Sequence, residues 1–201
     1  MQELHSKEDV FTMSEKWMQD MAKSSAVIKQ ALPILRDMLN DRKLNLMPVE
    51  GKEEEVCKML DKTCGIDYFV LRSDSETFGV AWRCQWVEPG KEYNSFTVRK
   101  SRETGAATEF EKRKNAVKNK SIYPYYVCQA FVNMYTNEII SLGLTTTETE
   151  LDYIVNPITI KEIRHTGKEQ DGQAEFYVLY WCDMRVFGYD VIVYKQNIGL
   201  T

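Results

Sequence analysis

The segment GIDYFVLRSDSETFGVAWRCQW, residues 65–86, narrows the possible folds of this chain more than any other stretch. Two runs rich in β-branched and aromatic residues, 66–72 and 77–87, flank the polar stretch SDSE. This pattern is typical of a β-hairpin. Asp67 stands near the start of the first run, and Arg83 and Gln85 lie two residues apart on the second, hence on one strand face. The hairpin therefore carries a candidate site.

The segments around this hairpin predict an α+β protein with a mixed sheet and helices on its faces. We expect helices over 52–62 and 108–119, and a three-stranded antiparallel meander from 66–72, 77–87 and 95–100. A fourth strand is expected over 123–133. Thr108 and Glu111 have the spacing of a capping box, which predicts where the second helix begins.

The two ends of the chain have different patterns. Apolar residues recur at helical spacing over 14–42, with Ser14 as a candidate N-cap and Pro33 as a kink or break. We expect an N-terminal helical arm over 1–47 and an α/β domain over 48–201, packed as one compact unit. A helix is expected over 146–155, followed by C-terminal β-hairpins.

The charge of the chain is unevenly distributed. The net charge of the 201 residues is −4, yet residues 97–120 hold eight Lys or Arg against three Glu, a local charge of +5. A basic band on an acidic body favours a directed contact with phosphates, and a solvated helix face is the alternative. The candidate nucleic-acid-binding residues are Arg99, Arg102, Lys112, Arg113 and Lys114.

The order helix, three antiparallel strands, helix, strand over residues 52–133 resembles the PD-(D/E)XK, or restriction-endonuclease-like, nucleases. In that family Asp67 would be the first acid, and one of Glu53, Glu54 and Glu55 would be the helix acid. Arg83 falls where the family has Lys. Ala81 stands where the family has its second carboxylate, so the sequence departs from the motif there.

The resemblance implies a site for Mg²⁺ or Mn²⁺ and hydrolysis of a phosphodiester bond. The implied metal ligands are Asp67, Glu54 and Gln85, and the implied catalytic residues are Asp67, Arg83 and Gln85. A structural ion pair between Asp67 and Arg83 is the alternative.

Two functions follow from these observations. The first is a metal-dependent nuclease-like protein that cleaves or binds the backbone of DNA or RNA. The second is a non-catalytic α+β protein-interaction module with a degenerate nuclease fold, of the kind that phages and mobile elements encode, binding a partner or a second copy through its N-terminal helices. Without a signal-peptide pattern or a long apolar run, we expect a cytoplasmic protein with no membrane contact.

Overall fold

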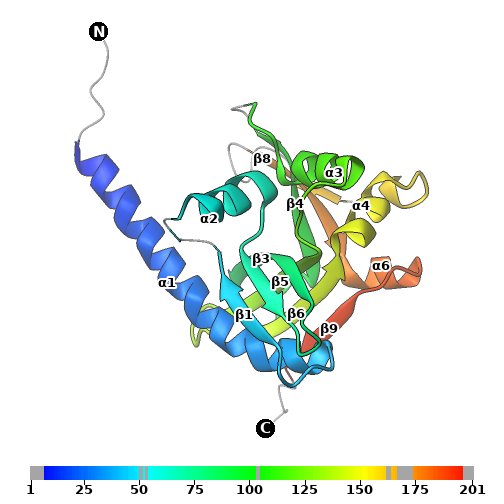
Figure 1. Ribbon diagram of the computed structural model, residues 1–201, viewed down its shortest axis with the longest axis horizontal. Coiled ribbons are helices and arrows are strands. Elements are labelled where there is room, and N and C mark those ends of the chain that lie inside the picture. The colour runs from blue at the N-terminus through cyan, green and yellow to red at the C-terminus, as the bar shows by residue number, and fades with distance from the viewer. Residues whose placement is uncertain are drawn as a thin grey trace.

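The computed structural model describes residues 7–49, 52, 54–102, 105–161, 164–166 and 174–196. The side chains of residues 7–22, 102, 161, 164–166 and 174 lie outside this description. In chain order the elements are α1 (Lys7–Met38), β1 (Asn45–Pro48), α2 (Glu55–Met59), the π-helical turn η1 (Leu60–Cys64), β2 (Tyr68–Leu71), β3 (Thr77–Val87), β4 (Ser95–Arg102), α3 (Glu109–Asn119), β5 (Tyr126–Asn133), β6 (Ile139–Thr146), α4 (Thr147–Val155), the 3₁₀ turn η2 (Thr159–Lys161), β7 (Arg164–Thr166), β8 (Ala174–Tyr180), α6 (Trp181–Val186) and β9 (Ile192–Lys195) (Figure 1).

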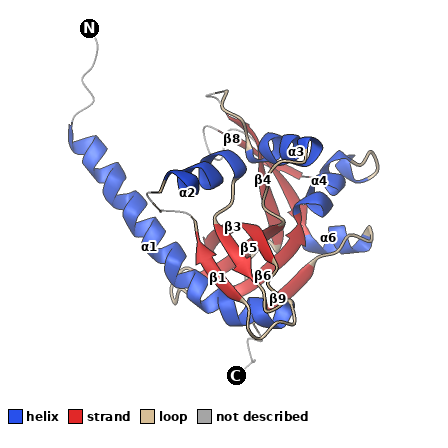
Figure 2. Cartoon of the chain, in the orientation of Figure 1, coloured by secondary structure: helices blue, strands red, loops and turns tan. Residues whose placement is uncertain are grey.

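The described strands form two sheets, which Figure 2 shows in red. A six-stranded sheet has the order β1-β2-β3-β5-β6-β9, and a three-stranded sheet has the order β4-β8-β7. Only β3 and β5 run parallel among these pairs, because the chain between them makes a crossover through β4 and α3. The protein is therefore a mixed α+β structure, as the sequence predicts.

Both faces of the large sheet are covered. The second half of α1 packs on one face, where Val27, Ala31 and Leu35 contact strand residues such as Leu142. The small sheet and the helices α4 and α6 cover the other face, around a core that includes Phe131. Figure 1 shows α1 along one flank of the molecule and α3, α4 and α6 on the opposite flank.

The expected helical arm packs into the main core from Val27 onward. The helix begins at Lys7 rather than after Ser14, and it continues through Pro33 to Met38. The strand β1 then pairs with β2, so the expected boundary between 47 and 48 falls inside a sheet strand. Contacts of the earlier side chains of α1 lie outside the described part, and dimerisation through them stays a prediction.

The predicted three-stranded meander is wrong in its third member. The hairpin of β2 and β3 is confirmed, with Tyr68 opposite Val80, but β4 pairs with β8 in the other sheet. A strand has two edges, and those of β3 are occupied by β2 and β5. Phe96 and Val98 of β4 are instead buried in the core between the two sheets.

The C-terminal quarter is only partly β-structure. The expected helix over 146–155 is confirmed as α4, and β7 pairs with β8 as a hairpin. Residues 181–186 are helical rather than extended, and β9 returns to the large sheet beside β6. The sequence analysis missed the strand β6. Gly143 of this strand leaves room for the buried Trp181 ring, because a Cβ atom at position 143 would lie 2.3 Å from that ring.

Within the described residues, no helix combines the length and the apolar character that crossing a membrane requires.

Candidate functional site

A cavity of about 460 Å³ opens where the two sheets and α3 meet. Its walls come from η1, β3, β5, β4 and α3. The charged and amide side chains that line it are Asp61, Lys62, Asp67, Arg83, Glu109, Lys112, Arg113 and Gln129. The structure thus brings together Asp67 and Arg83, two of the three catalytic candidates from the hairpin.

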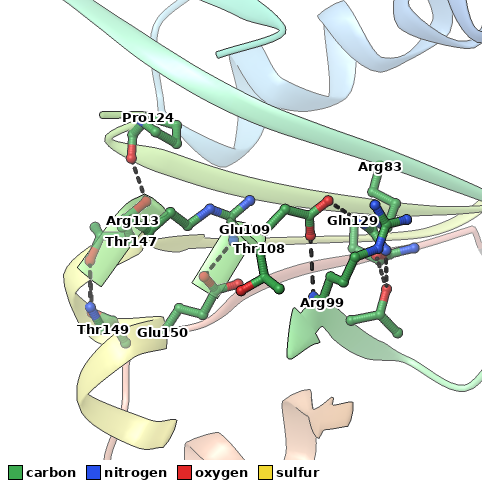
Figure 3. Close-up of polar contacts among 12 residues, drawn as sticks. Arg83, Arg99, Thr108, Glu109, Arg113, Pro124, Gln129, Thr147, Thr149 and Glu150 are labelled. Carbon is green, nitrogen blue, oxygen red and sulfur yellow. Dashed lines mark hydrogen bonds and ion pairs between the residues drawn. The ribbon is translucent and has the colours of Figure 1, made fainter. Parts of the chain in front are cut away.

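Arg83 is held in place by contacts from three elements. Its guanidinium forms an ion pair with Glu109 at the start of α3 and donates a hydrogen bond of 3.4 Å to the Thr97 hydroxyl on β4. It also lies 5.5 Å from the centre of the Phe176 ring on β8. Glu109, which the sequence analysis did not identify, is therefore an acid that pairs with Arg83 (Figure 3).

Glu109 is ionised in the cavity wall because cations surround it. One carboxylate oxygen pairs with Arg83, and the other accepts a hydrogen bond of 3.3 Å from the backbone N–H of Arg99. Burial opposes its ionisation, but the charges of Arg83, Arg113 and Arg99 and this N–H outweigh burial and lower the pKa of Glu109. Sequence reasoning missed this residue, although it directly follows the capping residue Thr108.

Gln129 is a buried amide with one end unsatisfied. It lies in the middle of β5, directly beside Arg83 of β3, and is 2% exposed. The Thr97 hydroxyl accepts from Arg83 and donates to the amide oxygen of Gln129 at 3.3 Å. This chain of hydrogen bonds orients the amide, and its Nε2 has no acceptor among the described residues. A buried donor of this kind costs free energy unless a ligand or a water accepts from it.

Arg113 is buried, which corrects the prediction that it lies on a solvated basic face. Its exposure is 8%, and it donates to Glu150 of α4 at 2.6 Å (Figure 3). Burial opposes the charge on Arg113, but Glu150, Glu109 and Asp67 together raise its pKa. For Glu150 the effect of burial is the larger one: it raises the pKa of this carboxyl, although the charge of Arg113 acts to lower it. Sequence analysis missed Glu150, because nothing in the pattern of α4 marks it as buried.

Asp67 stands just before β2, and its carboxylate accepts a hydrogen bond of 2.6 Å from the backbone N–H of Trp82 on β3. Its backbone N–H donates to Val80, so the residue closes the end of the hairpin. The negative charge of Asp67 also helps to raise the pKa of Arg113. Asp67 therefore has a structural role in the hairpin as well as a place in the cavity wall.

Two of the predicted metal ligands, Gln85 and Glu54, lie apart from the cavity lining. Gln85 is half-buried on β3, two residues beyond Arg83, and Glu54 is exposed where α2 begins. Glu53 lies outside the described residues, whereas Ala81 does line the cavity.

The basic candidates occupy different surroundings. The guanidinium of Arg99 lies 5.3 Å from the Phe176 ring, and Lys112 donates to the carbonyl oxygen of Lys62 at the cavity edge. Lys114 is exposed, as expected, on the far face of α3. Arg102 ends β4, and its side chain lies outside the described part.

The described carboxylates do not present a ready metal site. Across the described ranges, no three His, Cys, Asp or Glu side chains converge as a metal would require. Both oxygens of Glu109 already accept from arginine donors. Asp61 and Asp67 are the other carboxylates of the lining, and Asp67 already accepts from the backbone N–H of Trp82.

Comparisons with family models, with curated proteins and with solved structures give no match to this chain.

Proposed function

We propose that this protein binds the backbone of a nucleic acid and that one backbone phosphate enters the cavity between the two sheets. The observation that carries the proposal is the Nε2 group of Gln129, a buried donor with no acceptor in the described part of the chain, in a cavity lined by Arg83, Lys112 and Arg113. Phosphate oxygens accept hydrogen bonds from amide, guanidinium and ammonium groups alike.

The balance of charge in the cavity supports a phosphodiester as the ligand. Four lining side chains are cationic, namely Lys62, Arg83, Lys112 and Arg113, and three are acidic, namely Asp61, Asp67 and Glu109. A phosphodiester carries a single negative charge. Arg83 and Arg113 are already paired with Glu109 and Glu150, so Lys62 and Lys112 are the lining cations that would meet this charge. The basic band over 97–120 extends the positive charge to neighbouring phosphates.

The nuclease resemblance enters as the second part of the proposal. We propose that the segment from α2 to β5 is a variant of the restriction-endonuclease-like core whose third strand has left the sheet. The β2–β3 hairpin and the parallel strand β5 behind the α3 crossover support this interpretation. Cleavage would need Mg²⁺ or Mn²⁺ at Asp67. Glu109 is poorly suited to be a second metal ligand, because both of its carboxylate oxygens already have partners.

Gln129→Met tests the phosphate site, because Met keeps the volume of the side chain and removes the donor. Affinity for labelled single- or double-stranded DNA or RNA should fall roughly 10- to 150-fold, the effect of one hydrogen bond to a charged group. Stability to urea should fall by about 0.5–1.5 kcal/mol, because Met also lacks the amide oxygen that accepts from the Thr97 hydroxyl, whereas the lost donor has no acceptor among the described residues. Gln85→Met, on the same strand face as Arg83 but outside the lining, is the matched control and should bind normally.

The same titration, run between about 50 and 200 mM salt, should show affinity falling by roughly 0.7–0.9 log units per log unit of salt for each phosphate contacted. Adding Mg²⁺ or Mn²⁺ then tests cleavage, which Asp67→Asn should abolish. Unchanged binding by Gln129→Met would refute the phosphate site. If no nucleic acid binds even at low salt, the protein-interaction module becomes the better explanation.

A further inference from the structure

A second hollow, of about 600 Å³, lies on the opposite face of α3 from the cavity. Glu109, Lys112 and Arg113 line the cavity, whereas Phe110 and Lys114 line the hollow. Successive helical residues are rotated by about 100°, so these two sets point to opposite sides of the helix. The strand β8 completes the hollow with Tyr177.

Two aromatic rings and two lysines form the wall of this hollow, here called the aromatic groove. The rings of Phe110 and Tyr177 meet edge to face, with centroids 5.4 Å apart. The ammonium of Lys114 lies 5.5 Å from the Phe110 ring, and that of Lys100 lies 5.7 Å from the Tyr177 ring. Both rings are half-buried and so stay accessible at one side.

Acidic side chains near the aromatic groove are already engaged. Glu111 lines the groove, but its carboxylate accepts from the backbone N–H of Thr108 at 2.8 Å and from the Thr108 hydroxyl at 3.1 Å. Glu175 pairs with Lys100 at 3.5 Å. Lys114 also lies in the groove, and no described carboxylate forms an ion pair with it.

We propose that the aromatic groove binds a single-stranded segment of nucleic acid, with a base against Phe110 and Tyr177 and a phosphate at Lys114. This inference rests on the proposed function, because the strand would be the continuation of the one whose phosphate lies in the cavity. Aromatic rings interleaved with cations are the usual means of holding unpaired bases, since every base offers a ring face to stack on. As the phosphate draws the ammonium groups outward, the base takes their place on the rings.

The distance between the two sites sets the length of strand required. A helix with its side chains is about 10–12 Å across. The path around half of such a helix is about 16–19 Å long, which nucleotides stacked at about 3.4 Å per step cover in roughly five steps. A strand that passes around α3 from the cavity therefore reaches the aromatic groove about five nucleotides away.

The test compares two oligonucleotides of equal length and charge, one of thymidines or uridines and one whose sugars carry no bases. Wild-type protein should bind the base-bearing strand roughly 5- to 150-fold more tightly, the effect of stacking one base on an aromatic side chain. Phe110→Leu should remove most of that difference and leave the affinity for the baseless strand unchanged. Tyr135→Leu, which removes an exposed ring outside the groove, is the control and should bind both strands as wild type does.

The outcomes separate this inference from the proposed function. If the baseless strand binds in a salt-dependent way but bases add nothing, the cavity site stands and the aromatic groove is refuted. If neither strand binds, both fail. Cross-linking of wild-type protein to a bromouracil-substituted strand should join the strand to Phe110 or Tyr177. A cross-link found only at residues outside the groove would overturn the inference even if Phe110→Leu does not fold.

Discussion

Arg113 carries its charge inside the protein, whereas its neighbour Lys114 carries its charge at the surface. The two residues look equivalent in the sequence EKRKNAV, where both belong to one basic run. In the structure Arg113 pairs with the fully buried Glu150, so it helps to hold α3 against α4. Lys114 is exposed with its ammonium over the Phe110 ring, so a ligand in solvent can reach it.

At the residue scale, we predict that Arg113→Ala lowers the free energy of unfolding by about 3–5 kcal/mol, because it leaves Glu150 buried without its cation. Lys114→Ala, the adjacent control, should change stability by about 0.5 kcal/mol or less. Denaturation in urea measures both. Equal effects of the two variants would contradict the buried ion pair. The deficit of Arg113→Ala should shrink at lower pH, since burial raises the pKa of Glu150 and lets it take up a proton.

The helix α3 is the element on which both proposed sites depend, and its first turn is set by local sequence. The capping box is confirmed: the Thr108 hydroxyl accepts from the Glu111 N–H at 3.2 Å, and Glu111 accepts from the Thr108 N–H. This start places Glu109 beside Arg83 and turns Phe110 to the other side. The position of the cap therefore determines which residues line the cavity.

At the element scale, we predict that Thr108→Val destabilises the protein by roughly 0.5–2 kcal/mol, because it removes the cap hydroxyl and keeps the shape of the side chain. Nucleic-acid binding should weaken as well, since the first turn of α3 carries Glu109 and Phe110. Glu111→Gln, which retains a capping box, serves as the control and should have a smaller effect. Thermal unfolding followed by circular dichroism measures the change. Native stability of Thr108→Val would mean that packing alone holds the start of α3.

At the scale of the whole molecule, the cavity is the seam between two sheets. Its charged residues come from η1, from Asp67 just before β2, from β3 and from α3, and the buried amide comes from β5. The ion pair of Arg83 with Glu109 links the large sheet to α3, and the Thr97 hydroxyl links the small sheet to both Arg83 and Gln129. Loss of charge in this network should therefore weaken the packing of the two sheets and α3 against one another and lower the stability of the protein.

We predict a pH dependence of stability that follows from Glu109. Its pKa in the folded protein is lower than the ordinary value of 4.5, so folding favours the ionised form. The stabilisation is present above that ordinary value and is lost as the pH falls through the lowered pKa. Glu109→Gln should therefore flatten the fall of the melting temperature in acid, whereas Glu54→Gln, at the exposed start of α2, should leave it unchanged. An equally steep fall in Glu109→Gln would exclude this carboxylate as the cause.

The hairpin and the candidate site show how far prediction from sequence reaches here. Asp67 and Arg83 were expected to share a site on the hairpin, and both line the cavity. Gln85 shares the strand face of Arg83 but lies outside the lining, since strand periodicity gives the face and not the depth of the neighbouring surface. Glu109 and Gln129 were not identified as site residues, because their importance comes from contacts with β3 and β4.

The sequence by itself determined the β2–β3 hairpin, the start of α3 at its capping box and the extent of α4. Each of these depends on residues only a few positions apart, and their spacing is visible in the chain. Only the tertiary structure decided that β5 rather than β4 lies beside β3, that β4 joins β8, and that Arg113 is buried against Glu150. Arg113 and Glu150 are 37 residues apart, and no local periodicity records which distant element will cover a given side chain.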